Sequence, residues 1–78
     1  MENQIRAYVR EELAKLSSEN RVVNLTGVYP SLLEIMIDGF DWSEADTNGW
    51  QLDYWLETDK YEISGCAYYG KATIELKG

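Results

Sequence analysis

The chain has 78 residues and a formal net charge of −7, from 14 acidic and 7 basic side chains. This length fits one domain, 1–78, near the size at which a single core is only just sufficient. The acidic balance opposes direct binding to nucleic acid or an anionic membrane, because phosphates would be repelled, and it favours basic partners or cations. Solubility is the competing explanation of the same charge.

The single cysteine, Cys66, rules out an internal disulfide, which is typical of a reducing compartment. The N-terminal segment is charged throughout and lacks the apolar region of a secretory signal. No apolar run approaches the roughly 20 residues that a membrane-spanning helix needs. We therefore expect a cytoplasmic protein without a membrane anchor.

The first predicted element is a helix from Asn3 to about Leu16. Its apolar residues recur every three or four positions, which gives one stripe that must pack on another element. The stripe consists of Ile5, Tyr8, Val9, Leu13 and Leu16. The polar run from Ser17 to Asn20 is expected to end the helix, since its side chains compete for backbone hydrogen bonds.

Two strands are predicted next. Arg21–Val28 is rich in β-branched residues, and Tyr29-Pro30-Ser31 interrupts it because proline cannot donate to a sheet. Leu32–Asp38 is predicted to be the second strand. Alternation would place Leu33, Ile35 and Ile37 on one face and Glu34, Met36 and Asp38 on the other. Gly39–Asn48 is predicted to be a loop, long enough to be a candidate for function.

The C-terminal part reads as an antiparallel meander of strands Trp50–Glu57, Tyr61–Tyr69 and Ala72–Leu76. Closing the first hairpin at Asp59-Lys60 places apolar residues opposite one another, and so does closing the second at Gly70-Lys71. The predicted pairs are Leu52 with Ala67, Tyr54 with Gly65, Leu56 with Ile63, Tyr69 with Ala72, Ala67 with Ile74 and Gly65 with Leu76.

These elements predict an α+β fold, with the N-terminal helix packed on a four-stranded antiparallel sheet, one strand fewer than the five segments with strand-like sequences. The order of a helix followed by a meander resembles the cystatin/monellin arrangement. The Gln-x-Val-x-Gly element of cystatin inhibitors has no counterpart in this chain, so no inhibitory residue is carried over.

Catalytic residue types are scarce. The chain has no histidine, which removes the commonest general base and the commonest metal ligand. Cys66 is expected opposite Asp53 and Glu75, whose charges would raise the pKa of a thiol rather than lower it. Acidic pairs could in principle act as acid and base, but so small a sheet offers little depth for a substrate. We expect a protein that is not an enzyme and needs no cofactor.

The segment Glu44-x-Asp46-x-Asn48-Gly49 resembles the opening of an EF-hand calcium loop. Its first position is Glu instead of Asp, and Trp55 stands at the twelfth position, where the bidentate Glu would be. Asn-Gly is also a strong turn signal. A turn is therefore the preferred interpretation, and no metal site is predicted.

The candidate binding surface is the sheet face away from the helix. It is predicted to carry aromatic and apolar side chains among carboxylates, which suits a partner with basic side chains. The residues proposed to contact that partner are Trp55, Tyr68, Asp53, Glu57, Glu62 and Met36. The alternative for these rings is burial in a second small core or between two copies of the chain as a homodimer.

The resulting hypothesis is a non-enzymatic acidic interaction module that binds a basic protein. A nucleic-acid mimic, of the kind that small phage or mobile-element inhibitors use, is one form of it by analogy of size and charge. A small-ligand or cation-binding domain that uses the 39–49 loop is the alternative.

Overall fold

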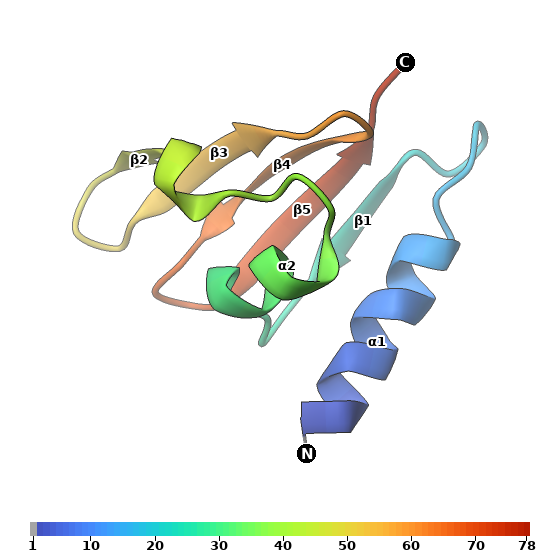
Figure 1. Ribbon diagram of the computed structural model, residues 1–78, viewed down its shortest axis with the longest axis horizontal. Coiled ribbons are helices and arrows are strands. Elements are labelled where there is room, and N and C mark those ends of the chain that lie inside the picture. Colours follow the sequence, from blue (N-terminus) through green and yellow to red (C-terminus); the bar gives the residue numbers. More distant parts are fainter. Residues whose placement is uncertain (1) are drawn as a thin grey trace.

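The computed structural model describes residues 2–78 as a helical layer on one face of a sheet (Figure 1). The sheet has five strands in the order β1-β5-β4-β3-β2, and every neighbouring pair is antiparallel. The elements are α1 (Glu2–Ala14), β1 (Val22–Leu25), α2 (Pro30–Met36), the 3-10 turn η1 (Trp42–Glu44), β2 (Asp46–Asn48), β3 (Asp53–Glu57), β4 (Tyr61–Cys66) and β5 (Lys71–Leu76). The predicted α+β class is confirmed, with five strands instead of four.

Helix α1 packs beside β1, as its apolar stripe predicts. Val9 at the centre of the stripe is fully buried, and the Tyr8 hydroxyl accepts a hydrogen bond from the Thr26 N–H at 3.2 Å. After the helix, the Ser17 hydroxyl accepts from the backbone N–H of Asn20 at 3.1 Å. This side-chain bond replaces the next helical turn, in line with the predicted helix end.

The predicted strand over Leu32–Asp38 is wrong, because most of this segment belongs to helix α2. Pro30 sits in the first turn of the helix, where its missing N–H costs nothing. Leu33 and Ile37, four residues apart, are buried, whereas Ile35 between them is 67% exposed. The alternation of apolar and polar residues in this segment fits a strand as well as a helix. The buried residues, however, are spaced four apart, as in a helix.

The register of the β3–β4 hairpin is confirmed. Leu56 lies opposite Ile63, and Tyr54 lies opposite Gly65. The hairpin closes around Asp59-Lys60, where the Thr58 N–H donates to the Tyr61 carbonyl at 2.8 Å. This register follows from matching the apolar residues of the two strands.

The predicted register of the β4–β5 hairpin is wrong. Gly65 lies opposite Ala72 instead of Leu76, and Ile74 lies opposite Ile63 instead of Ala67. The chain turns within 67–70 rather than at Gly70-Lys71, and Gly70 ends the turn with φ of 66°. Because the shift is an even number of residues, the side chains within Tyr61–Cys66 and Ala72–Leu76 keep their predicted faces, whereas residues 67–69 leave the strand.

The predicted 39–48 loop contains both η1 and the edge strand β2. The Asp41 side chain caps η1 by accepting from the Ser43 N–H at 3.0 Å. Strand β2 then pairs with β3, with Asp46 opposite Trp55 and Asn48 opposite Asp53. This short strand is the fifth strand that the sequence did not predict.

The buried core lies on the helix side of the sheet. Its strand residues occupy alternate positions, and the helices and connecting segments supply the rest. The buried apolar residues are Val9, Val23, Leu25, Val28, Leu33, Ile37, Phe40, Tyr54, Leu56, Ile63, Ala72 and Ile74.

Candidate functional site

The outer face of the sheet is the face that the helices leave uncovered (Figure 1). Strand alternation places Asp53, Trp55 and Glu57 of β3 on this face, with Glu62 of β4 opposite Glu57. No outer-face strand residue within 2–78 is buried, and the Trp55 ring is 42% exposed. The structure thus places four of the six predicted contact residues together on one open surface.

Trp55 borders a small hollow at the β2 edge of the sheet. The hollow has a volume of about 240 Å³ and lies along β2 and β3; its lining residues are Asp46, Thr47, Asn48, Asp53, Tyr54 and Trp55. Asp46 is the direct cross-strand neighbour of Trp55, and Asp53 is two residues away on the same face. The Trp55 indole and the carboxylate-bearing residues Asp46 and Asp53 thus lie next to one another beside this hollow, and an aromatic ring with carboxylates suits a guanidinium or ammonium group.

A row of three carboxylates crosses the same face. Glu57 lies opposite Glu62, as predicted, and Glu62 also lies opposite Glu75 of β5. The Lys77 ammonium stands 3.9 Å from Glu57 and partly offsets this row at one end. Like charges in direct cross-strand positions destabilise a sheet slightly. A partner that brings positive charge would relieve that repulsion.

Met36 and Tyr68 do not lie where the prediction placed them. Met36 belongs to α2 and packs partly against the core on the opposite side of the sheet, so it cannot share a surface with Trp55. Tyr68 lies in the 67–70 turn beyond the end of β4. The first error follows from the wrong strand, and the second from the wrong hairpin register.

Tyr68 instead belongs to a cluster at one end of the sheet, which we call the aromatic tip and define as Trp50, Leu52, Tyr68 and Tyr69. These side chains are 75%, 44%, 59% and 52% exposed. Trp50 and Leu52 were predicted to belong to the strand Trp50–Glu57. They lie instead in the turn before β3, which the Asn48-Gly49 signal could have indicated.

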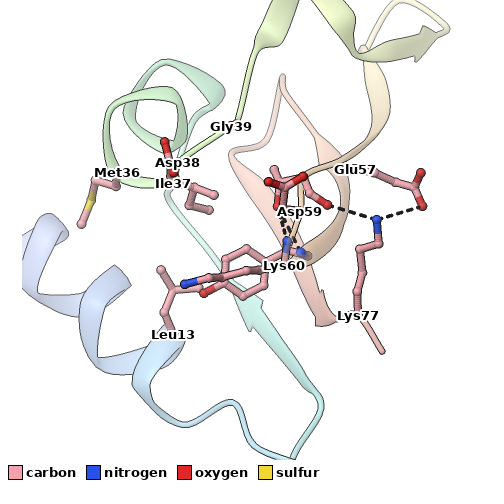
Figure 2. Close-up of a pocket in the computed structure, with 11 residues that line it drawn as sticks. Leu13, Met36, Ile37, Asp38, Gly39, Glu57, Asp59, Lys60 and Lys77 are labelled. Carbon is pink, nitrogen blue, oxygen red and sulfur yellow. Dashed lines mark hydrogen bonds and ion pairs between the residues drawn. The ribbon is translucent and has the colours of Figure 1, made fainter.

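A second cavity, of about 760 Å³, opens at the opposite end of β3 and β4 from the aromatic tip. Figure 2 shows Met36 and Asp38 on one side of it and the hairpin residues Asp59 and Lys60 on the other. Its remaining lining residues are Leu13, Ile37, Gly39, Glu57, Thr58, Tyr61 and Lys77. Of the 39–49 loop proposed for ligand binding, only Gly39 lines this cavity.

The hydrogen bonds of this cavity stabilise the hairpin. The Lys77 ammonium donates to the Thr58 carbonyl at 3.1 Å, and the buried Thr58 hydroxyl accepts from the Tyr61 N–H at 3.0 Å. The Lys60 ammonium has no hydrogen-bond or ion-pair partner within residues 2–78. Lys60 is therefore the cation of this cavity that a ligand could engage.

Two potentially reactive groups, the Tyr54 hydroxyl and the Cys66 thiol, are explained by their packing in the fold. Burial raises the pKa of Tyr54 to about 12, so its hydroxyl stays protonated at neutral pH and cannot act as a base. The Cys66 thiol is half-buried and donates to the Gln51 carbonyl at 3.3 Å. This bond ties β4 to the turn before β3, which is a structural role.

The segment that resembles a calcium loop forms the strand β2 and a turn. Gly49 has φ of 76°, which fits the turn interpretation. Asp46 and Asn48 lie in a strand paired with β3, so their side chains follow the sheet rather than surrounding a cation. Within residues 2–78, no group of three acidic or cysteine side chains is arranged to hold a metal ion.

None of the helices in the described part of the chain is both long and apolar enough to span a membrane. No family model, curated protein or solved structure matches this chain. The predicted cystatin/monellin-like topology is not confirmed, and helix α2 between β1 and β2 departs from a single helix followed by a meander.

Proposed function

We propose that this chain is a non-enzymatic interaction module that binds a basic protein through the outer face of its sheet. The contact residues are Trp55 at the centre, Asp46 and Asp53 beside it, and Glu57 and Glu62 along the sheet. Met36 is withdrawn from this set because it lies on the other side of the sheet. Glu75 is added because it continues the carboxylate row.

The observation that carries this proposal is the hollow beside Trp55. An arginine or lysine of the partner would enter it, with its charge against Asp46 or Asp53 and its flat or apolar part on the indole. Exposed indoles that become buried at the centre of an interface often contribute 2 kcal/mol or more to binding. Trp55 is the outer-face residue best placed for this role, since it is half exposed and flanked by carboxylates.

The carboxylate row would act mainly on the rate of association. Charges at the rim of an interface steer the encounter and lose their effect as salt rises, whereas buried anchors control dissociation. The row of like charges, together with the small size and acidic charge of the chain, also suits mimicry of a nucleic-acid backbone as one form of the proposal. In that form the partner is a protein whose own ligand is DNA or RNA.

Affinity capture from an extract of the source cells tests the proposal. Immobilised wild-type chain is expected to retain a basic protein at low salt and release it as salt rises. The purified partner should then bind Trp55→Ala at least about tenfold more weakly than wild type. Trp50→Ala is the matched control, because it removes an equally large exposed ring away from the outer face. Equal loss with both variants, or with neither, would contradict the proposal.

The cavity beside Lys60 favours a second candidate function, the binding of a small anionic or zwitterionic ligand. The observation behind it is a cavity of about 760 Å³ with an apolar side at Leu13 and Met36 and the Lys60 ammonium, for which residues 2–78 supply no partner. A thermal-shift screen of small metabolites would detect such a ligand, since binding raises the melting temperature. Loss of the shift in Lys60→Ala, but not in Lys71→Ala, would assign it to this cavity.

A further inference from the structure

The aromatic tip combines high exposure with a fixed shape. Its rings come from two separate turns and meet edge to face: Trp50 and Tyr68 have centroids 5.3 Å apart with planes at 71°, and Tyr68 and Tyr69 are 4.9 Å apart at 82°. Rings at nearly right angles leave corner-shaped slots between them instead of one flat platform. Each slot has two apolar walls.

Hydrogen bonds hold the two turns of the tip together. The Tyr68 N–H donates to the Gln51 carbonyl at 3.1 Å, and the Ala67 N–H donates to the Leu52 carbonyl at 3.0 Å. The Gln51 side-chain amide donates to the Tyr69 hydroxyl at 3.3 Å. Because these bonds are already formed, a ligand would not have to order the rings, and that lowers the entropy cost of binding.

The backbone of the tip is also strained in a way that packing does not explain. Leu52 has φ of 55°, a conformation that leucine rarely adopts, and its side chain is nonetheless 44% exposed. Strain of this kind concentrates at sites of recognition. Here it maintains the turn that presents Trp50, the most exposed of the large apolar residues in 2–78.

The chemistry of the tip defines its ligand. The eight residues in 49–52 and 67–70 carry no charge, although 27% of the chain is charged. Each ring has a hydrogen-bond donor at its edge, one indole N–H and two phenol O–H groups. Since the Tyr69 oxygen already accepts from Gln51, its own proton is free to donate outward. The ligand is therefore uncharged, has flat apolar faces and offers acceptors.

We propose that the aromatic tip binds a proline-rich peptide segment in the polyproline II conformation. Pyrrolidine rings would fill the slots on either side of Tyr68, and the donors of Trp50 and Tyr69 would bind backbone carbonyls of the peptide. Those carbonyls are unpaired in polyproline II, and the conformation is preformed, which is why aromatic clusters recognise it. This surface is separate from the outer face and does not depend on the function proposed for that face.

The test uses a capped, uncharged oligoproline peptide of about ten residues, which forms polyproline II in solution. Titration of the whole chain, followed by tryptophan fluorescence and by amide NMR shifts, is expected to show saturable binding with shifts confined to 49–52 and 67–71. Trp50→Ala and Tyr68→Ala should each weaken binding by about tenfold or more. Trp55→Ala is the matched control and should bind as wild type does.

Three outcomes would overturn the proposal. The first is no saturation up to about 1 mM peptide, which corresponds to negligible affinity. The second is equal binding of a peptide with alanine in place of every proline. The third is a different occupant of the same residues, either a soluble oligosaccharide such as cellohexaose or a second copy of the chain seen by sedimentation. Circular dichroism of each variant shows that a loss of binding is not a loss of fold.

Discussion

The two faces of the sheet share one strand register, but one face pairs apolar residues and the other pairs acidic residues. On the covered face Ile63 lies opposite Leu56 and Ile74, and all three are buried. One residue earlier, on the outer face, Glu62 lies opposite Glu57 and Glu75. The covered face fixes the register by apolar contact. The outer face is therefore free to hold like charges side by side, which folding alone would not favour.

The largest expected difference between the faces is in stability. Ile63→Ala should lower the free energy of unfolding by about 2–5 kcal/mol, because it leaves a cavity at a fully buried position. Ser64→Ala, its neighbour on the outer face, should change it by less than about 0.5 kcal/mol. Urea denaturation of both variants measures the contrast. Equal effects would mean that the outer face is covered in solution.

Gly65 shows how closely the strands approach on the covered face. A Cβ atom at this position would stand 2.0 Å from the Lys71 carbonyl oxygen, so a side chain would force the backbones of β4 and β5 apart. The obstacle is thus the backbone of β5. Gly65→Ala should destabilise the fold by about 1–3 kcal/mol. A melting temperature equal to that of the wild type would contradict this register.

Tyr54 is the polar exception on the covered face. Its ring packs edge-on against Trp42 at 5.1 Å, and its hydroxyl is buried without a hydrogen-bond partner within residues 2–78. Removing an unsatisfied buried hydroxyl should stabilise the protein, by about 1 kcal/mol for Tyr54→Phe. Differential scanning calorimetry at neutral pH tests this expectation, and a clear loss of stability would show that the hydroxyl has a partner.

The same hydroxyl predicts a pH dependence. Burial raises the pKa of Tyr54 from its ordinary value of 10.0 to about 12 in the folded state. The unfolded chain therefore releases this proton at a lower pH than the folded chain, and stability falls as the pH rises from about 10 to 12. In Tyr54→Phe this part of the alkaline loss should be missing. Identical alkaline profiles for the two proteins would contradict the assignment.

The smallest expected change in folding stability is for a substitution on the outer face. Glu62→Gln removes the middle charge of the carboxylate row and should stabilise the fold by about 0.2–1 kcal/mol at low salt, since both cross-strand neighbours are also acidic. The gain should shrink as salt screens the remaining charges. Ser64→Ala, which changes no charge, is the control on the same face. A loss of stability in Glu62→Gln would mean that the row holds a bound cation.

Apolar alternation correctly predicted one hairpin register and the faces of the residues that lie in β3, β4 and β5. It could not distinguish between two registers of the second hairpin or between strand and helix in Leu32–Asp38. The β3–β4 register was predictable because the Asp59-Lys60 turn and the Leu56–Ile63 pair agree. The β4–β5 register was not, because two turns separated by an even shift satisfy the alternation equally. Alternation in Leu32–Asp38 likewise fits a strand. The segment forms a helix instead, and Pro30 in its first turn is a common helix-start residue that the alternation does not take into account.

The candidate sites divide in the same way. Trp55, Asp53, Glu57 and Glu62 could be placed on the outer face from alternation within one correctly registered hairpin. The aromatic tip could not be predicted, because it forms where two turns meet, and most of both turns was predicted to belong to strands. Contacts between loops depend on the three-dimensional path of the chain rather than on any period in the sequence.

The central claim is that the outer face is a binding surface, and amide NMR with the captured basic partner tests it most directly. We expect the largest shift changes at the Trp55 indole N–H and at the amides of 46–48, 53–57 and 62–64, with the changes weakened by salt and absent in Trp55→Ala. Changes confined to the cavity around Thr58 and Lys60, or to the aromatic tip, would contradict the claim.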